Sequence, residues 1–285
     1  MTDSSRVWLI TGCSSGLGAR LAHRVLARGD RVIATARRVE TLAELEQAGA
    51  AVLSLDVTAD QQAVRQTVDA AIQIYGRVDV LVNNAAYLAI GTWEDLEIED
   101  FSAQFETNVF GTIKVTRAML PHLRARRDGT LVFIGSRSGW IGDAGVGAYA
   151  GSKFALEGLV EALKGEVEPL GIKTLLIEPG RFRTKLLTLG NMKAADAASD
   201  DYAPIAMALM AHLAAEDQQQ HGDPDKLVDL MIDLVRHEGV AAGREVPFRF
   251  PVGTDVHADV KAKCRQTLEL LDDWEAVLTS TDFGA

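Results

Sequence analysis

The stretch RVWLITGCSSGLG, residues 6–18, joins a short apolar run to a turn that is rich in glycine and serine. Its first part, residues 6–11, has the β-branched and apolar composition of a buried strand. After the turn, apolar residues recur at helical spacing from Leu21 to Leu26, and Gly29 is suited to end that helix. A strand, a tight turn and a helix in this order predict the first unit of an α/β fold.

The same alternation of strand and helix continues to about residue 180. Apolar runs predict further strands at residues 31–36, 51–56, 78–83, 129–135, 172–179 and 245–250. The runs before residue 180 are almost uninterrupted, as is typical of parallel strands that helices cover on both faces. We therefore predict an open, doubly wound parallel sheet. Because no linker or repeat interrupts the sequence, residues 1–285 are predicted to form a single domain.

The last third of the chain has a different composition. Residues 186–240 are rich in Ala, Met and Leu but include Gly190, Asn191 and Pro204, so we predict a variable helical lid over the substrate. A permanently packed helical pair is the alternative. A helix is predicted for residues 255–280. Its apolar positions keep helical spacing: Val260, Cys264, Leu268, Leu271, Trp274 and Leu278.

Charge and cysteine content restrict the class of protein. The 285 residues carry a formal net charge of −11, which argues against a general electrostatic grip on nucleic acid or anionic membrane. Cys13 and Cys264 fit no disulfide framework or metal spacing, so a reducing compartment is the simplest inference. No segment reaches the ~20 apolar residues of a membrane span, and the first residues lack the core of a signal peptide. These features predict a soluble cytoplasmic protein.

The turn TGCSSGLG, residues 11–18, is suited to bind a dinucleotide. Glycines let the backbone approach a pyrophosphate, and the N-terminus of the following helix supplies free N–H groups and positive potential. A simple glycine and serine turn is the alternative, but the position between a strand and a helix favours binding. The predicted contacts in this turn are Gly12, Ser14, Ser15, Gly16, Leu17 and Gly18.

The stretch GAYAGSKFALEG, residues 147–158, places a phenol and an ammonium four residues apart. If this segment is a helix, Tyr149 and Lys153 lie on one face and their polar ends can meet. Taken alone, such a pair is ordinary surface chemistry, with a lysine lying over an aromatic ring.

Several of these motifs, in this order, resemble the short-chain dehydrogenase/reductase superfamily, and its 17β-hydroxysteroid-dehydrogenase-like branch is the nearest match. The resemblance rests on TGCSSGLG, NNAA at residues 83–86, Ser136 and the pair Tyr149 and Lys153, and it covers residues 7–184. It implies a parallel sheet of about seven strands, assembly as a homodimer or homotetramer, and reversible hydride transfer between a nicotinamide and a carbonyl or alcohol.

The resemblance also implies roles for four residues. Tyr149 exchanges a proton with the substrate oxygen, and the neighbouring Lys153 ammonium is expected to lower its pKa from the usual ~10. Lys153 also binds the nicotinamide ribose, and Ser136 hydrogen-bonds the substrate oxygen. Asn108 holds a water beside the lysine. Taken singly, Ser136 can equally be a turn residue and Asn108 a polar residue that bends a helix.

Further cofactor contacts are implied by position. Asp56 and Val57 correspond to residues that meet the adenine. Asn83 and Ala85 correspond to the adenosine side, although Asn83 can serve mainly to tie neighbouring strands together. The segment around the nicotinamide carboxamide corresponds to Pro179, Gly180, Phe182 and Thr184. Ala86 departs from the family, which usually has glycine there, so its methyl group is expected to cause a small adjustment.

The end of the second predicted strand bears on the choice of cofactor. An acidic residue about 20 positions after the glycine turn would bind the ribose 2′-hydroxyl of NAD, but Ala36 leaves that position without a carboxylate. Arg37 can make a forked contact to a 2′-phosphate, with Arg38 beside it and Ser15 in the turn as a further donor. The sequence therefore favours NADP(H) over NAD(H). A solvated arginine pair in a loop is the alternative.

The substrate is less well defined by the sequence. Apolar and methionine-rich residues near the predicted strand ends favour a hydrophobic alcohol, ketone or aldehyde: Tyr87, Trp93, Trp140, Ile141, Leu186, Leu187, Met192, Met207 and Met210. Each of these can equally belong to the core or to a dimer interface. Arg137, Arg181 and Arg183 either bind an anionic substrate or pair with nearby acids.

Two other classes of function stay open at this point. One is a regulatory protein that senses NADP without catalysis, although such a protein should show damage at Ser136, Tyr149 or Lys153. The other is a sugar-nucleotide epimerase or dehydratase, which usually carries a differently spaced glycine turn and a longer C-terminal domain.

Overall fold

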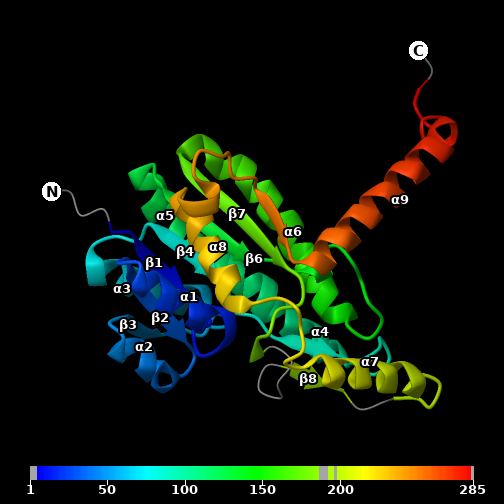
Figure 1. Cartoon of the computed structure of the whole chain (residues 1–285), viewed down its shortest axis with the longest axis horizontal. Helices are drawn as coiled ribbons and strands as arrows, with labels where there is room; N and C mark the ends of the chain where they lie inside the picture. The colour runs from blue at the N-terminus through cyan, green and yellow to red at the C-terminus, as the bar shows by residue number, and fades with distance from the viewer. Residues whose placement is uncertain (1–4, 186–191, 196–197, 284–285) are drawn as a thin grey trace.

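The computed structural model describes residues 5–185, 192–195 and 198–283. Seven parallel strands form one sheet in the order β3-β2-β1-β4-β6-β7-β9 (Figure 1). The strands of this sheet are β1 (Val7–Ile10), β2 (Arg31–Ala36), β3 (Ala51–Ser54), β4 (Val80–Asn83), β6 (Gly129–Ile134), β7 (Ile172–Pro179) and β9 (Arg249–Val252). The predicted doubly wound parallel sheet is confirmed.

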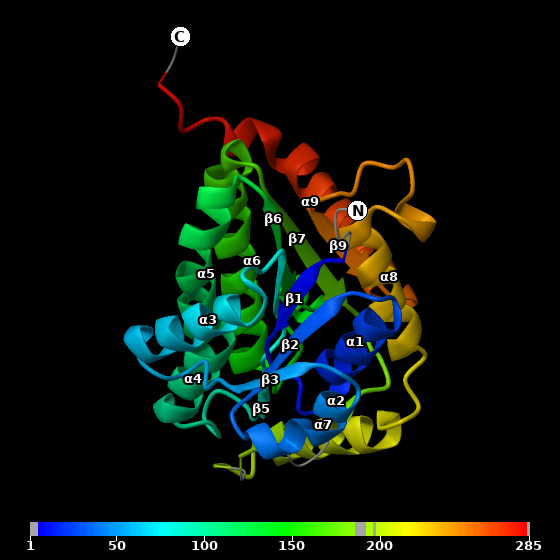
Figure 2. The ribbon, with the colours of Figure 1, turned by 90° about the vertical axis from the view of Figure 1, so that its left-hand side faces the viewer.

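Helices cover both faces of this sheet, and Figure 2 shows α1 and α8 on one side with α3 and α5 on the other. The helices of the described chain are α1 (Gly16–Ala27), α2 (Ala43–Gln47), α3 (Gln61–Tyr75), α4 (Ile98–Phe105), α5 (Thr112–Arg126), α6 (Gly147–Val167), α7 (Ala203–Glu216), α8 (Pro224–Arg236) and α9 (Thr254–Leu278). None of these described helices is long and apolar enough to cross a membrane.

The strands bury side chains on both faces because neighbouring residues point in opposite directions. Trp8 and Ile10 belong to the core beneath α1, α2 and α8, whereas Val7 and Leu9 belong to the core beneath α3, α5 and α6. All four are at most 1% exposed. This double burial explains the uninterrupted apolar runs of the sequence.

Two features differ from the sequence prediction. The last strand begins at Arg249 rather than at residue 245, because its ladder pairs Leu176 with Arg249 and ends with Pro179 opposite Val252. A separate two-stranded sheet, β5 (Leu88–Ile90) with β8 (Met192–Ala194), was not predicted. Its strands are three residues long, which is too short for an alternating pattern to stand out.

Candidate active site

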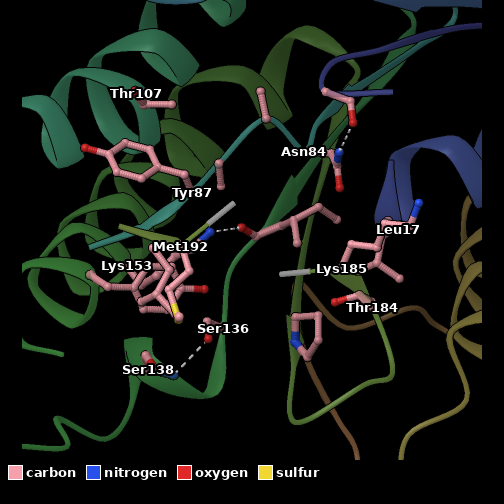
Figure 3. A pocket seen from close by; sticks show the side chains of 18 of the residues that line it. Leu17, Asn84, Tyr87, Thr107, Ser136, Ser138, Lys153, Thr184, Lys185 and Met192 are labelled. Carbon is pink, nitrogen blue, oxygen red and sulfur yellow. Dashed lines mark hydrogen bonds between the residues drawn. The ribbon is translucent and has the colours of Figure 1, made fainter. Parts of the chain in front are cut away.

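A cavity of about 890 Å³ lies at the carboxyl ends of the strands. Its wall is formed by the segments that follow β1, β2, β3, β4, β6 and β7, together with residues of α6 and α7. In Figure 3, Lys153 and Met192 lie on one side of this space, and Leu17 and Thr184 lie on the other. The volume is at the upper end of the range for small-molecule sites, which fits an extended ligand.

The glycine turn after β1 packs directly on the loop after β4. Gly12 has a φ of +71°, and a Cβ added there would lie 2.8 Å from the Cα of Ala85. The Asn84 amide nitrogen donates to the carbonyl oxygens of Thr11 and Gly12 at 2.9 and 3.1 Å. Asn84 therefore holds the turn in place, a role that the sequence analysis missed although it quoted the motif.

Gly16 and Gly18 serve this turn in different ways. A Cβ on Gly16 would meet nothing within 4 Å, and Gly16 lines the cavity with a φ of +62°. A Cβ on Gly18 would lie 2.5 Å from the carbonyl oxygen of Gly12, so Gly18 lets α1 approach the turn closely. The open backbone at the first turn of α1 fits a pyrophosphate, with Ser14, Ser15 and Leu17 beside it at the cavity wall.

Tyr149 and Lys153 lie in the N-terminal part of α6 and both reach the cavity. The Lys153 Nζ lies 5.7 Å from the centroid of the Tyr149 ring and donates to the carbonyl oxygen of Ile134 at 2.6 Å. The two residues are 8% and 3% exposed. The helix thus brings the phenol and the ammonium together, and the end of β6 fixes the direction of the lysine.

Burial changes the acidity of both groups. It raises the pKa of the Tyr149 phenol, while a hydrogen bond with Ser136 acts in the opposite direction. The expected lowering of this pKa is therefore wrong for the free protein, because lost hydration of the phenolate outweighs the stabilising contacts. Burial also lowers the pKa of Lys153 to about 8, although the nearby Glu157 carboxylate opposes this shift.

Ser136 follows β6 and begins a short 3₁₀ turn. Its Oγ accepts a hydrogen bond from the backbone N–H of Ser138 at 3.0 Å, as Figure 3 shows. This bond orients the hydroxyl at the cavity wall. Ser136, Tyr149 and Lys153 therefore lie around one space, although they come from two different elements.

Residues 6–194 match the family model of the short chain dehydrogenases. The chain belongs to the short-chain dehydrogenase family. A crystal structure of a short-chain dehydrogenase from Streptomyces avermitilis is similar to it, with 37% identity, a TM-score of 0.88, and coverage of 99% of this chain and 100% of that one. The oxidoreductase BOA17 of Botryotinia fuckeliana is 33% identical over 94% of this chain and 96% of its own length. A 3-ketodihydrosphingosine reductase of Bacteroides thetaiotaomicron is 35% identical over 87% of this chain and 88% of its own length.

This dehydrogenase is accordingly an oxidoreductase that acts on CH–OH groups, and its remaining predicted residues can be placed in the structure. Asn108 lies in a π-helical segment, Glu106–Gly111, and is 1% exposed. Its amide nitrogen donates to the carbonyl oxygen of Tyr87 at 3.2 Å and to the Ser152 Oγ at 3.1 Å. Asn108 thus lies behind the cavity wall, between the loop after β4 and helix α6. π-Helical turns of this kind often occur at functional sites.

The other predicted cofactor contacts divide into two groups. One group lines the cavity: Arg37, Asp56, Val57, Ala85, Pro179, Gly180, Phe182 and Thr184. The second group, Gly18, Arg38 and Asn83, lies outside the described lining of the cavity. Asn83 is 5% exposed and donates to the Thr116 Oγ1 at 3.1 Å, so it ties β4 to α5.

Ala86 lines the cavity without a strained backbone. Among the described residues other than glycine, positive φ angles occur at Arg127, Gln218 and His237. The methyl group of Ala86 therefore causes no conformational penalty in the dehydrogenase.

A buried charged cluster behind Ser136 was missed by the sequence analysis. Glu178 is fully buried, and its Oε1 accepts from the Arg249 Nε at 3.0 Å and from the Trp140 Nε1 at 2.9 Å. Arg249 also pairs with Glu157, whose Oε1 accepts from the backbone N–H of Ser136 at 3.4 Å. The sequence did indicate one member of this cluster, because Glu157 follows Lys153 by four residues and so lies on the same face of a predicted helix.

Burial and the nearby Glu178 carboxylate raise the pKa of Glu157 to about 8, and Arg249 acts in the opposite direction. One guanidinium faces two buried carboxyl groups here, and this shortage of positive charge is consistent with the raised pKa of Glu157. The cluster joins β7, β9 and α6 directly behind the serine turn.

The three arginines near the strand ends pair within the chain. Arg137 binds Asp143 and Asp259, and Arg181 binds Glu216. The Arg183 Nε donates to the carbonyl oxygen of Gln220 at 2.6 Å. These contacts favour the structural alternative over an anion site.

The wall of the cavity beside α7 combines the apolar Met192, Leu209 and Leu213 with the polar Lys193, His212 and Glu216. Leu209 and Leu213 of α7 pack with Met192 against a cluster that contains Leu88 and Tyr149. Both leucines line the cavity and were missed by the sequence analysis.

The residues predicted to line the substrate site have different positions in the structure. Tyr87 lines the cavity, but Trp93 is 80% exposed and Met207 is 71% exposed. The Trp140 indole donates a hydrogen bond to Glu178. Ile141 and Met210 are not among the described residues that line the cavity. Leu186, Leu187, Gly190 and Asn191 lie outside the described residues.

Proposed function

We propose that this dehydrogenase interconverts a carbonyl and a primary or secondary alcohol on an apolar small molecule, with NADP(H) as cofactor and Tyr149 as acid and base. The observation that carries the proposal is the convergence of Tyr149, Lys153 and Ser136 on the cavity that the glycine turn also lines. The turn after β1, the turn after β6 and helix α6 thus bring their polar groups to one cavity, as a shared ligand would require.

In the reducing direction, Tyr149 donates its proton to the carbonyl oxygen of the substrate. Its raised pKa keeps the phenol protonated at neutral pH, so it is ready to act as an acid. The Lys153 ammonium then stabilises the phenolate that remains, and Ser136 hydrogen-bonds the substrate oxygen. A bound nicotinamide supplies or accepts the hydride. In the oxidising direction, Tyr149 takes the proton back from the alcohol.

The remaining roles follow the family pattern. Lys153 binds the nicotinamide ribose, and Asn108 holds a water that connects the lysine to solvent. Gly12, Ser15 and Leu17 surround the pyrophosphate, and the cavity wall after β7 meets the nicotinamide. Gly18 and Asn83 act indirectly, because Gly18 lets α1 approach the turn and Asn83 ties β4 to α5. Arg38 is exposed beside Arg37, and its contact with the cofactor stays a prediction.

NADP(H) is favoured over NAD(H) by the residues at the end of β2. Arg37 lines the cavity and is exposed, and Ala36 beside it offers no carboxylate to a ribose hydroxyl. A guanidinium in this position makes forked hydrogen bonds to a 2′-phosphate.

An apolar substrate is supported by Leu209, Leu213 and Met192 at the cavity wall. The Bacteroides relative is named as a reductase of 3-ketodihydrosphingosine, a ketone. We propose a hydrophobic ketone, aldehyde or alcohol as the substrate class. Three inferences from the sequence stay predictions. They are the assignment to the 17β-hydroxysteroid-dehydrogenase-like branch, the cytoplasmic location, and assembly as a homodimer or homotetramer.

The test is oxidation of NADPH and of NADH by the purified chain across a panel of aldehydes, ketones, quinones and steroids, with Tyr149→Phe alongside. We expect NADPH-dependent turnover of at least one apolar carbonyl, and none by the variant. A chain that binds NADPH but turns over no carbonyl, and no alcohol in reverse, would instead be the NADP-sensing protein. Activity only on sugar nucleotides would identify an epimerase or dehydratase.

A further inference from the structure

Helix α9 extends away from the body of the molecule, as Figure 1 shows. Val256, near its start, is its buried residue, and every residue from Cys264 to Phe283 is exposed. An isolated helix of about 15 residues is only marginally stable in water. A helix that projects this far therefore requires packing that its own chain does not supply.

The exposed part of α9 carries an apolar seam. Residues spaced alternately by four and three positions lie on one side of the helix: Val260, Cys264, Thr267, Leu271, Trp274 and Leu278. Leu271, Trp274 and Leu278 are 48%, 58% and 49% exposed. This alternation is the a and d pattern of a two-stranded coiled coil, whose seam faces a second helix. Apolar side chains of this size, aligned along one helix face, are typical of an interaction surface.

The charges beside this seam differ between the two halves of the helix. Lys261 and Arg265 flank it in the first half, and Asp272 and Glu275 flank it on the same side in the second half. None of these four described side chains forms an ion pair within the chain. A parallel pair of such helices would place this side of one helix against the other side of its partner, where Leu270 and Val277 lie, so these charges would have no complementary partner. An antiparallel pair places this side against itself in reverse, which brings base beside acid.

We propose that α9 is an assembly arm, which pairs antiparallel with α9 of a second copy of this chain about a two-fold axis near Leu268. In this register, Cys264 packs against Trp274 of the second copy and Val260 against Leu278. Lys261 faces Glu275, and the two Leu268 side chains face each other. Each complementary contact occurs twice, as a closed isologous interface requires.

The first experiment measures assembly by sedimentation velocity at several protein concentrations. The wild-type chain should be a dimer or a multiple of dimers. Leu271→Glu, which places a charge in the seam at an exposed position, should halve the mass of the particle. Gln266→Glu adds the same charge on the opposite side of α9 and should leave the mass unchanged. A monomeric wild-type chain, or a Leu271→Glu variant that assembles as wild type, would overturn the proposal.

The second experiment tests the orientation of the pair. Lys261→Glu and Glu275→Lys should each weaken association about tenfold at low salt, and the double variant should restore it. In a Cys264→Ala background, Leu268→Cys should form a disulfide between copies under mild oxidation, whereas Gln266→Cys should not. A parallel pair would instead cross-link the native Cys264 to itself, and the single charge variants would associate as the wild-type chain does. Either result would rule out the antiparallel arm.

Discussion

The Lys153 ammonium lies 5.7 Å from the centroid of the Tyr149 ring and donates to the carbonyl oxygen of Ile134 at 2.6 Å. The lysine is therefore held by the end of β6 and not by the phenol alone. This arrangement keeps a cation beside Tyr149 whether or not the phenol is ionised, which is the condition for reversible proton transfer.

Tyr149→Phe should lower turnover by about 10²–10⁴-fold, because it removes the acid and keeps the ring. The affinity for NADPH, measured by fluorescence titration, should change by less than about threefold. Tyr87→Phe removes another hydroxyl from the same cavity and serves as the control. A Tyr149→Phe enzyme that retains most of its activity would contradict the assignment.

Arg37→Asp should shift the preference from NADP toward NAD. The substitution replaces a partner of the 2′-phosphate with a carboxylate that repels it. A charge-assisted hydrogen bond is worth about 1.5–3 kcal/mol, so the ratio of kcat/KM values should move at least tenfold. Arg38→Asp makes the same charge change outside the described cavity lining and should move the ratio much less. Equal effects of the two variants would mean that only net charge matters.

Gly18→Ala should weaken cofactor binding and lower the melting temperature, because its Cβ would lie 2.5 Å from the carbonyl oxygen of Gly12. The backbone must then shift α1 away from the turn. Gly158→Ala in α6 meets nothing within 4 Å and should raise stability by about 1 kcal/mol. Thermal unfolding and NADPH titration of both variants check this contrast. An unaffected Gly18→Ala protein would show that the turn tolerates the displacement.

The pKa of about 8 for Glu157 predicts a pH dependence of stability. Between pH 4.5, the usual pKa of the group, and about pH 8, the folded chain holds the Glu157 proton. The unfolded chain releases this proton in the same range. The free energy of unfolding should therefore fall as pH rises through this window, and this contribution should level off above it. Glu157→Gln should remove that part of the slope in urea unfolding at several pH values. Glu161→Gln, at an exposed neighbour of Arg249, should leave the slope in place.

Helix α7 should behave as a lid. None of its residues is buried, yet Leu209 and Leu213 contact the cluster around Tyr149. Hydrogen exchange should therefore be fast in α7 of the free protein and slow when NADPH and an apolar ketone are bound. Helix α8, with seven buried residues including Leu227, Val228 and Met231, should exchange slowly in both states. Equal exchange in α7 with and without ligands would favour permanent packing.

Much of the architecture follows from local sequence patterns. The apolar runs of the strands, the glycine turn after β1 and the helical spacing of α1 are each written in consecutive residues, so the parallel fold could be predicted. The nearness of Tyr149 to Lys153 also follows from spacing, because four residues make about one turn of a helix. The motif order was sufficient to identify the family.

Other features depend on contacts between distant segments. The Arg249 ion pairs with Glu157 and Glu178 join three elements, and no local pattern indicates that both carboxylates become buried together. The raised pKa of Tyr149 arises from the packing around it, so spacing alone gave the opposite sign. The π-helical turn that positions Asn108, and the approach of Leu209 and Leu213 to the cavity, are likewise tertiary. Local pattern determines which elements form, whereas burial and the electrostatics that follow from it are properties of the packed chain.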